Sequence, residues 1–216
     1  MLHHYKTIYQ DGTGEYVEKK SRFIANVFAI ESEEDATAKI EQIRKKHYDA
    51  RHHCFAYSLP TTPPTLRFSD DGEPSGTAGK PILEIITTNE LFHTLIVVTR
   101  YFGGTLLGTG GLVRAYTQAA KEGLANSVVI DKYLGNIYTF KTNYSYLGKI
   151  QYLLGMNQIS VLETNYQENI LYKILLPLEL QEKITKDIIE LSDGSIIPKK
   201  EEETYYGKLG NETILL

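Results

Sequence analysis

Cysteine and tryptophan are nearly missing from this chain. Among its 216 residues, Cys54 is the only cysteine, and there is no tryptophan. An intramolecular disulfide is therefore impossible, which fits a reducing compartment. A zinc site is disfavoured as well, because the chain offers no further Cys or His at the usual ligand spacing.

Long apolar stretches and an excess of basic charge are also missing. No segment approaches the roughly 20 consecutive apolar residues that span a bilayer, and the N-terminus has no apolar signal core. We therefore expect a cytoplasmic protein that does not enter a membrane. The formal net charge of −4 argues against binding of polyanions over the whole surface, so any nucleic-acid or phosphate site must be a local patch.

The composition is that of a globular protein with two parts. Hydrophobic residues make up 42% of the chain and aromatic residues 11%, which allows a packed core at this length. The sequence pattern changes between Val129 and Gly135. We predict an N-terminal domain over residues 1–130, a C-terminal domain over 135–206, and a loose or lightly docked tail over 207–216.

The N-terminal part mixes strand and helix patterns. Residues that favour strands fill 15–30, and Ser32 then precedes an acidic turn and a helix with a basic end. A strand follows over 53–59, while the segment from Leu66 to Pro81 has the Gly, Ser, Thr and acidic composition of a loop. A short helix over 81–87, a buried strand around 95–98 and a helix from Leu112 complete this part.

The C-terminal part follows the order β-α-β-β-α-β. Alternating apolar residues predict strands over 137–142, 159–166, 170–176 and 195–205, and helical spacing predicts helices over 145–156 and 179–191. This order is that of a ferredoxin-like domain. The whole chain is therefore expected to be an α+β protein.

The strongest local motif is a strand over 95–102, followed by a glycine-rich loop over 103–111 and a helix that begins at 112. Glycines let backbone N–H groups turn toward an anion, and the start of a helix adds partial positive charge. Arg100 and Arg114 flank the loop, where they can clamp a phosphate. Neither the P-loop nor the dinucleotide fingerprint is matched. The equal alternative is that these glycines serve tight turns and close packing.

A second motif, residues 69–80, places Asp70, Asp71 and Glu73 within four positions. Clustered carboxylates hold Mg²⁺ or act as a general base in some proteins. However, Asp-Gly and Pro-Ser-Gly are common turn formers. We therefore favour a solvated turn over a metal site, and we predict no metal and no cofactor.

A third motif, Arg51-His-His-Cys54, raises the question of a cysteine nucleophile. Neighbouring residues of a strand point to opposite faces, so His53 and Cys54 diverge. His52 shares the face of Cys54, but roughly 7 Å of strand separates the two residues. A half-buried structural cysteine is therefore favoured.

The first two motifs define one candidate surface between Arg67 and Tyr116. Tyr116 lies on the apolar side of its helix and is predicted to be core, whereas for Tyr101 both base stacking and a structural role stay open. No catalytic residue is assigned. The candidate ligand-binding residues are Arg67, Asp70, Asp71, Glu73, Ser75, Thr77, Lys80, Arg100, Tyr101, Gly103, Gly104, Thr109, Gly110, Gly111 and Arg114.

Five segments, 19–24, 51–54, 70–81, 98–104 and 107–116, resemble the IMPACT family, which includes the YigZ-like bacterial proteins. The resemblance implies an N-terminal ribosomal-protein-like β-α domain with a left-handed crossover. It also implies a ferredoxin-like C-terminal domain like those of elongation factor G. Eukaryotic relatives are linked to control of translation initiation with help from an extra N-terminal domain. We do not expect that domain here, because the resemblance begins near Lys19.

Three functions compete at this point. The first is RNA or ribosome binding in the regulation of translation, through an exposed patch made by Arg67, Lys80, Arg100 and Arg114. The second is an enzyme acting on a phosphorylated small molecule or nucleotide, in a concave pocket where the two loops meet. The third is a protein-interaction adaptor with exposed apolar surface near the loops. We rank them in this order.

Overall fold

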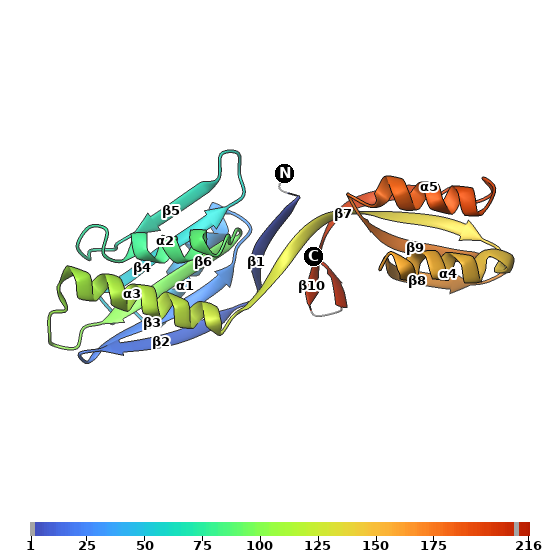
Figure 1. Ribbon diagram of the computed structural model, residues 1–216. Coiled ribbons are helices and arrows are strands. Elements are labelled where there is room, and N and C mark those ends of the chain that lie inside the picture. Colours follow the sequence, from blue (N-terminus) through green and yellow to red (C-terminus); the bar gives the residue numbers. More distant parts are fainter. Residues whose placement is uncertain (1–2, 210–211) are drawn as a thin grey trace. The chain divides into compact units, whose positions relative to one another are not determined.

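The structure is a computed structural model that describes residues 3–209 and 212–216. The chain divides into two compact units, Met1–Asp131 and Lys132–Leu216, and each contains a sheet and helices (Figure 1). Over the described residues, no helix is both long and apolar enough to cross a membrane. The strand β7, Val128–Thr142, continues from the first unit into the second.

The first unit is built on a five-stranded antiparallel sheet with the order β2-β3-β6-β4-β5. The central strand β6 is buried along almost its whole length, as its run of apolar residues predicts. A further strand, β1 His4–Gln10, pairs with β7. The strands of the sheet are β2 Gly12–Glu18, β3 Ser21–Ala29, β4 His52–Leu59, β5 Thr65–Ser69 and β6 Thr94–Tyr101.

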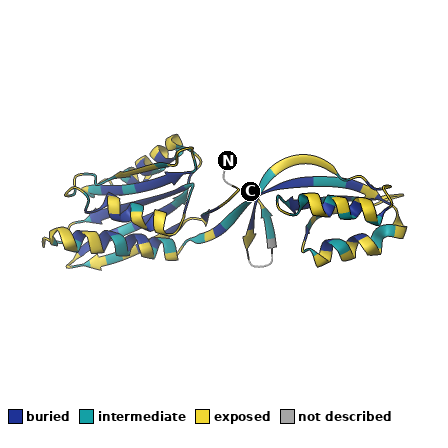
Figure 2. Ribbon diagram, turned by 45° about the horizontal axis from the view of Figure 1, so that its top comes forward, coloured by how far each residue is buried: buried dark blue, intermediate teal, exposed yellow. Residues whose placement is uncertain are grey.

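Helices cover both faces of this sheet. The helices α2, Gly79–Thr88, and α3, Gly108–Ala125, pack on one face in a cluster that includes Cys54 and Val98. The helix α1, Glu33–Lys46, covers the other face, where Ile40 packs with Val97. Figure 2 shows the strands mainly buried and the outer sides of the helices exposed. Successive side chains of β4 and β6 point to opposite faces of the sheet, so these strands contribute to two separate cores.

The helix α1 begins and ends as its sequence predicts. The Ser32 side chain accepts a hydrogen bond from the backbone N–H of Asp35, which satisfies one of the free donors at the helix start. Acidic residues occupy the first turn and basic residues the last turn, which suits the helix dipole. The C-terminal end of α1 therefore carries a group of cations, at residues 44–46.

The second unit contains the strand order β11-β10-β7-β9-β8. Its two helices pack on the sheet through an apolar cluster that includes Ile150, Ile174 and Ile184. After β7 the elements are η1 Tyr144–Tyr146, α4 Leu147–Met156, β8 Ser160–Tyr166, β9 Ile170–Pro177, α5 Gln181–Leu191, β10 Lys199–Leu209 and β11 Glu212–Leu215. The predicted alternation of strands and helices is therefore present, and β7 begins earlier than expected.

Three local predictions differ from the structure. The segment 66–81 was expected to be loop throughout, but its start belongs to β5, an edge strand with both Leu66 and Phe68 partly exposed. The strand pattern over 15–30 is two strands, because Lys19 and Lys20 adopt positive φ angles and reverse the chain. The tail over 207–216, expected to be loose or lightly docked, contains β11, which pairs with β10, and its residues 210–211 lie outside the described part of the chain. Edge strands give weak patterns because neither face is fully buried.

Candidate functional site

One end of the five-stranded sheet brings the sequence motifs together. The strand β6 ends there and β4 begins, so Arg100 lies directly opposite His52 in the register, and Phe23 of β3 lies opposite Arg100 on the other side. Residues opposite one another in an antiparallel sheet share a face. These three side chains therefore form a row on the face that α2 and α3 cover.

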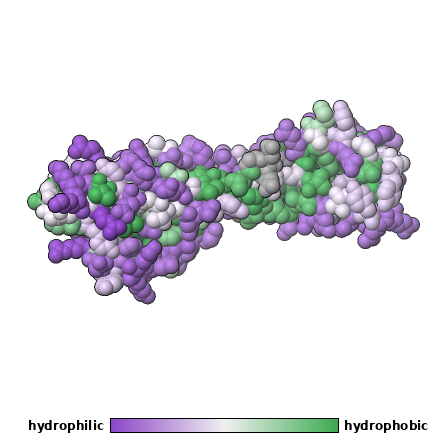
Figure 3. All heavy atoms as spheres, turned by 90° about the horizontal axis from the view of Figure 1, so that it is seen from below, coloured by the Kyte–Doolittle hydropathy of each residue, from purple (hydrophilic) through white to green (hydrophobic). Residues whose placement is uncertain are grey.

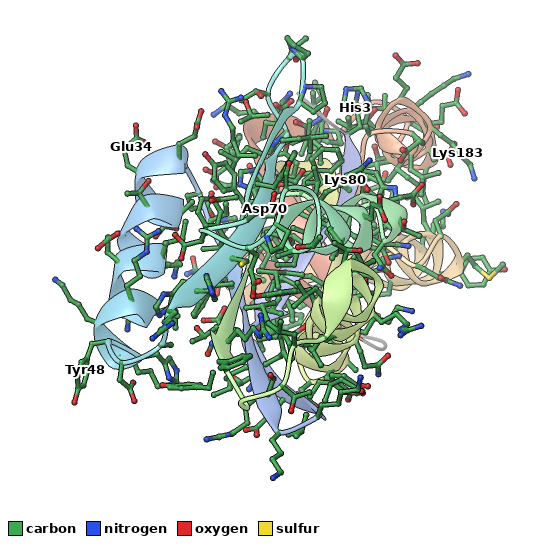
Figure 4. All side chains as sticks on the ribbon, turned by 90° about the vertical axis from the view of Figure 1, so that its left-hand side faces the viewer. His3, Glu34, Tyr48, Asp70, Lys80 and Lys183 are labelled. Carbon is green, nitrogen blue, oxygen red and sulfur yellow. The ribbon has the colours of Figure 1, made fainter. Side chains whose placement is uncertain are left out.

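A pocket of about 500 Å³ opens at this end of the sheet. It lies where the acidic loop after β5 meets the glycine-rich loop before α3, and Figure 4 looks onto this end, with Asp70 near the middle of the view. The pocket is lined by Arg51, His52, Glu73, Pro74, Arg100, Phe102, Leu106, Leu107, Gly108, Thr109 and Leu112. It combines cations, a helix start and apolar side chains.

Arg100 forms a buried ion pair inside the pocket wall. Its Nη1 lies 2.7 Å from Oε1 of Glu73, and the side chains of the two residues are 7% and 4% exposed. Tyr116 donates a hydrogen bond to the same Glu73 oxygen at 2.8 Å. The guanidinium also lies over the rings of Phe23 and Phe102. Arg100 is therefore not part of an exposed basic patch, contrary to the sequence-based expectation.

One polar atom of this buried group is left over. Among the described residues, Nε of Arg100 has no hydrogen-bond partner. Its Nη2 lies 3.5 Å from the Ser21 hydroxyl, at the outer limit of a hydrogen bond. A buried guanidinium with unused donors costs free energy unless another group approaches it. This Nε is shielded from solvent, so the unused donor lies behind the pocket wall rather than in the space open to a ligand.

The carboxylates of the acidic loop are engaged within the protein. Asp70 accepts hydrogen bonds from the backbone N–H groups of Gly76, Ala78 and Gly79, at 2.8–3.0 Å, and so caps the start of α2. Asp71 accepts a bond from the backbone N–H of His53, and Arg44 donates a second one to it. The loop is therefore an ordered structural element rather than a solvated turn.

The remaining candidates of the acidic segment are divided between its inside and its outside. Thr77 is buried and donates a hydrogen bond to the carbonyl of Pro74, whereas Ser75 and Lys80 are exposed. Arg67 on β5 has its Nε 3.9 Å from a Glu33 oxygen and is 64% exposed. Among the described residues, no group of three or more His, Cys, Asp or Glu side chains is placed to hold a metal ion.

The glycines of the second loop have different reasons to be glycine. A Cβ at Gly103 would meet the backbone of Lys20 at 2.1 Å, so this glycine permits a close approach of two backbones. Gly104 adopts a φ of +83°, which favours glycine in a turn. Gly110 has an ordinary φ, and a Cβ there would meet no atom within 4 Å. Neither packing nor backbone conformation of the protein requires glycine at this helical position.

The start of α3 lies open at the pocket. Leu107 stands at the N-cap, and no side chain among the described residues caps the helix or adds a negative charge to its first turn. The first turn contains Thr109, Gly110 and Gly111, of which Gly111 is the less exposed glycine. Free backbone N–H groups and the helix dipole together favour an anion at this place.

Two of the predicted side chains flank the pocket without entering it. Tyr101 donates a hydrogen bond to Asp49, and its hydroxyl lies 3.0 Å from Nδ1 of His47, so it fixes the turn after α1. Arg114 is exposed on α3. Of the candidate ligand-binding residues, Glu73, Arg100 and Thr109 therefore line the pocket, while the others support it or lie outside.

Several pocket residues were missed as ligand contacts. Arg51 is exposed and His52 half-buried, and both belong to a motif that was considered only for Cys54 chemistry. Nδ1 of His52 lies 2.9 Å from the carbonyl oxygen of Asp71, which only accepts, so this nitrogen carries the proton. The alternation from the buried Cys54 was a usable signal, because it directs His52 to the same sheet face.

Cys54 is a core residue in this arrangement. It is fully buried, and its Sγ lies 3.0 Å from the carbonyl of Asp70 and 3.4 Å from the Tyr116 hydroxyl. Burial raises the pKa of the Cys54 thiol and that of the Tyr116 hydroxyl well above their ordinary values. A nucleophilic role is therefore disfavoured, because the thiolate is the reactive form.

Comparison with known proteins places the chain in a family. Residues 19–124 match the model of the Impact N-terminal domain, and residues 140–195 match that of a domain of unknown function, DUF1949. The chain belongs to the IMPACT family. It is 38% identical to the IMPACT family member YvyE of Bacillus subtilis, over 98% of this chain and 97% of that protein.

Further relatives agree with this assignment. The identity to the IMPACT family member YigZ of Escherichia coli is 38%, over 82% of this chain and 88% of that protein. A crystal structure of a hypothetical protein is similar with a TM-score of 0.59 and 34% identity, and the match covers 94% of this chain and 99% of that one. The mixed α/β architecture is thus shared with a solved structure.

Proposed function

We propose that this protein binds a nucleoside phosphate in the pocket at the end of the first sheet. We further propose that the bound nucleotide belongs to RNA and that the protein acts in the regulation of translation. The observation that carries the proposal is the meeting of an uncapped helix start, the exposed Arg51 and the apolar Phe102 around one hollow of about 500 Å³. Pockets of roughly 300–1,000 Å³ are typical for small ligands.

The phosphate is best placed at the start of α3. The backbone N–H groups of its first turn are free to donate to phosphate oxygens, and the helix dipole favours the negative charge. Arg51 lines the same hollow and offers a forked donor for a phosphate. Arg100 has its charge balanced by Glu73 and its side chain is 7% exposed, so it adds no net charge to the site.

The base is best placed against the apolar wall. Phe102 is 53% exposed and Leu106 is 83% exposed, although both line the pocket. An exposed aromatic ring beside a phosphate site is what stacking of a base requires, and stacking contributes about 1–3 kcal/mol per base. The pocket thus offers one polar end and one apolar end, as a nucleotide does.

Two sources can supply this ligand, a free nucleotide or an RNA strand. The role in translation rests on the RNA source and on the resemblance to translation-linked relatives, and we place the protein in the cytoplasm on the same ground.

The ribosomal-protein-like and ferredoxin-like fold assignments belong to this proposal. The strand order β10-β7-β9-β8 with two helices on the sheet supports the second of them.

An enzyme that acts on a phosphorylated small molecule is the second candidate. It is favoured by the concave pocket, which lies where the two loops meet. The adaptor hypothesis is favoured by the exposed side chains of Phe102 and Leu106 near the loops, but it receives less support overall. On the face of the first unit that Figure 3 shows, hydrophobic side chains form small separate patches rather than one broad surface.

The test is calorimetric titration with adenosine 5′-monophosphate and with a 5′-phosphorylated single-stranded RNA of eight nucleotides. We expect both to bind, and we expect Arg51→Ala to weaken both by about 10-fold or more, because a hydrogen bond to a charged group is lost. Arg67→Ala is the matched control, since Arg67 is also an exposed arginine but lies outside the pocket.

Each outcome distinguishes the candidates. If RNA binds more tightly than the mononucleotide, the RNA source is supported. Equal affinities would favour the free nucleotide and the second candidate. If neither ligand binds, or if Arg67→Ala weakens binding as much as Arg51→Ala does, the proposed pocket is wrong.

A further inference from the structure

The C-terminal end of α1 and the turn that leads to β4 form a basic and aromatic ridge beside the pocket. We call residues 44–51 the ridge; they contain four cations, at 44, 45, 46 and 51, and one acid, Asp49. Lys45 and Lys46 are exposed at the end of α1, and Arg51 lines the pocket. Lys45, Lys46 and Arg51 therefore place exposed positive charge together on a chain whose total charge is −4.

Tyr48 is the most exposed aromatic side chain of the ridge. Its exposed fraction is 86%, and Figure 4 shows it pointing away from the domain at the outer end of α1. A large aromatic side chain in this position contributes little to the core. Phe102, exposed at the mouth of the pocket, is a second ring at the same end of the sheet.

The ridge is held firmly against the sheet. Tyr101 at the end of β6 donates a hydrogen bond to Asp49 at 3.0 Å, and its hydroxyl also contacts His47. The ring nitrogen Nε2 of His53 lies 3.2 Å from the backbone carbonyl of His47. These contacts fix the ridge next to the strand that leads into Phe102. Tyr48 and Arg51 are three residues apart, so their Cα atoms lie within about 11 Å of each other.

We propose that the ridge is a track for single-stranded RNA that continues from the pocket, with Tyr48 as a stacking platform for a base outside it. Stacking on an aromatic ring combined with cations along the backbone is the means by which proteins bind single strands without reading their sequence. The inference rests on the proposed function, because the pocket takes one nucleotide of the strand and the ridge takes those that follow.

The charges that face the ridge favour RNA over an acidic protein segment. The nearest acids are already engaged: Glu41 and Asp71 pair with Arg44, and Asp49 accepts from Tyr101. Lys45, Lys46 and Arg51 are left exposed. An acidic peptide would use the cations, but it would stack on Tyr48 only where it carries an aromatic side chain, whereas every nucleotide of an RNA strand carries a base.

The experiment measures fluorescence anisotropy of a 5′-phosphorylated, 3′-labelled eight-nucleotide RNA, with adenosine 5′-monophosphate binding measured in parallel. We expect Tyr48→Ala to weaken octamer binding by about 10-fold or more and to leave mononucleotide binding unchanged. Tyr48→Phe should retain octamer binding, since the ring face is kept. Tyr152→Ala is the matched control, because Tyr152 is 71% exposed and lies in the second unit.

The cations of the ridge give an independent readout. Replacing Lys45 and Lys46 by alanine should reduce the dependence of octamer binding on salt, by about one unit of slope for each phosphate that a lysine no longer neutralises. A duplex of the same length should lose nothing on Tyr48→Ala, because its bases are already stacked.

The results separate this inference from the proposed function. Octamer affinity that is unchanged in Tyr48→Ala, while the mononucleotide still binds, overturns the track and leaves the pocket in place. Equal loss of octamer and mononucleotide binding in Tyr48→Ala also overturns it, since Tyr48 would then act on the pocket. Absence of any nucleotide or RNA binding by the unmodified protein overturns both.

Discussion

The pocket has two walls: the acidic wall is the loop after β5 that contains Asp70 and Glu73, and the glycine-rich wall is the loop that leads into α3. These walls use their polar groups in opposite ways. On the acidic wall, the Asp70 carboxylate accepts from three backbone N–H groups and caps α2, and Glu73 neutralises Arg100. On the glycine-rich wall, the start of α3 has no capping side chain among the described residues. The carboxylates of the charged wall are therefore engaged within the protein, while the uncharged wall still has donors to offer.

This difference shows that charge in a sequence does not by itself mark the binding side of a site. Carboxylates close to a following helix satisfy its first N–H groups and become structural. A helix start made of Gly108, Thr109 and Gly110 has no such side chain, so it remains available to a ligand. Substitutions on the two walls should accordingly affect different properties, stability on one and binding on the other.

The largest effect is expected from Glu73→Ala. This change leaves Arg100 buried without its carboxylate, and breaking a buried ion pair from one side costs about 3–5 kcal/mol of unfolding free energy. It also removes the acceptor of the Tyr116 hydroxyl. The measurement is urea unfolding followed by circular dichroism.

The control for Glu73→Ala is Glu41→Ala, which removes a carboxylate from a half-exposed ion pair with Arg44. That change should cost less than about 1 kcal/mol, because exposed pairs contribute little. The double variant Glu73→Leu/Arg100→Met should be more stable than Glu73→Ala, since no charge is left buried. A Glu73→Ala protein as stable as the Glu41→Ala protein would contradict the structural role of the acidic wall.

A smaller loss is expected from Asp70→Ala. The three backbone N–H groups that Asp70 accepts from would lose their partner, and α2 would lose its cap, at a cost of about 2 kcal/mol. Asp70→Asn keeps one acceptor oxygen, so its unfolding free energy should lie between those of the unmodified protein and Asp70→Ala. Hydrogen exchange at Ala78 and Gly79 is the local measurement. Unchanged exchange in Asp70→Ala would show that the cap is dispensable.

Much of the fold follows from local patterns in the sequence. The helix α1 is specified by Ser32 and by residues such as Ile40 at helical spacing, and the second unit follows from alternation and length. The strand β5 was missed because Leu66 and Phe68 lie on an edge and stay partly exposed, so the segment lacks a buried face. Edge strands are fixed by their neighbour rather than by their own pattern.

The candidate site was predictable in its place but not in its roles. The motifs located both loops, because glycine and turn residues are local signals. Whether Arg100 was free or paired depended on a contact with Glu73 across 27 residues, which no local pattern contains. Arg51 was missed for the complementary reason: nothing near it in the sequence indicates that the α3 start folds against it.

The smallest change in stability is expected from Gly110→Ala. This variant is also the most direct test of the difference between the acidic wall and the glycine-rich wall. No atom lies within 4 Å of the position a Cβ would take, and the residue is helical with an ordinary φ, so alanine should raise stability by up to about 1 kcal/mol. At the same time, the added methyl group would stand beside the free N–H groups of α3. We therefore expect weaker binding of adenosine 5′-monophosphate in a protein that is at least as stable.

Gly103→Ala is the contrasting variant for this test. A Cβ at Gly103 would lie 2.1 Å from the backbone of Lys20, so this change should destabilise the first unit although it lies in the same loop. Titration and urea unfolding of both variants separate the two roles of glycine. If Gly110→Ala binds the nucleotide as the unmodified protein does, the open space at the α3 start is not used by a ligand. The two walls would then differ in capping but not in function.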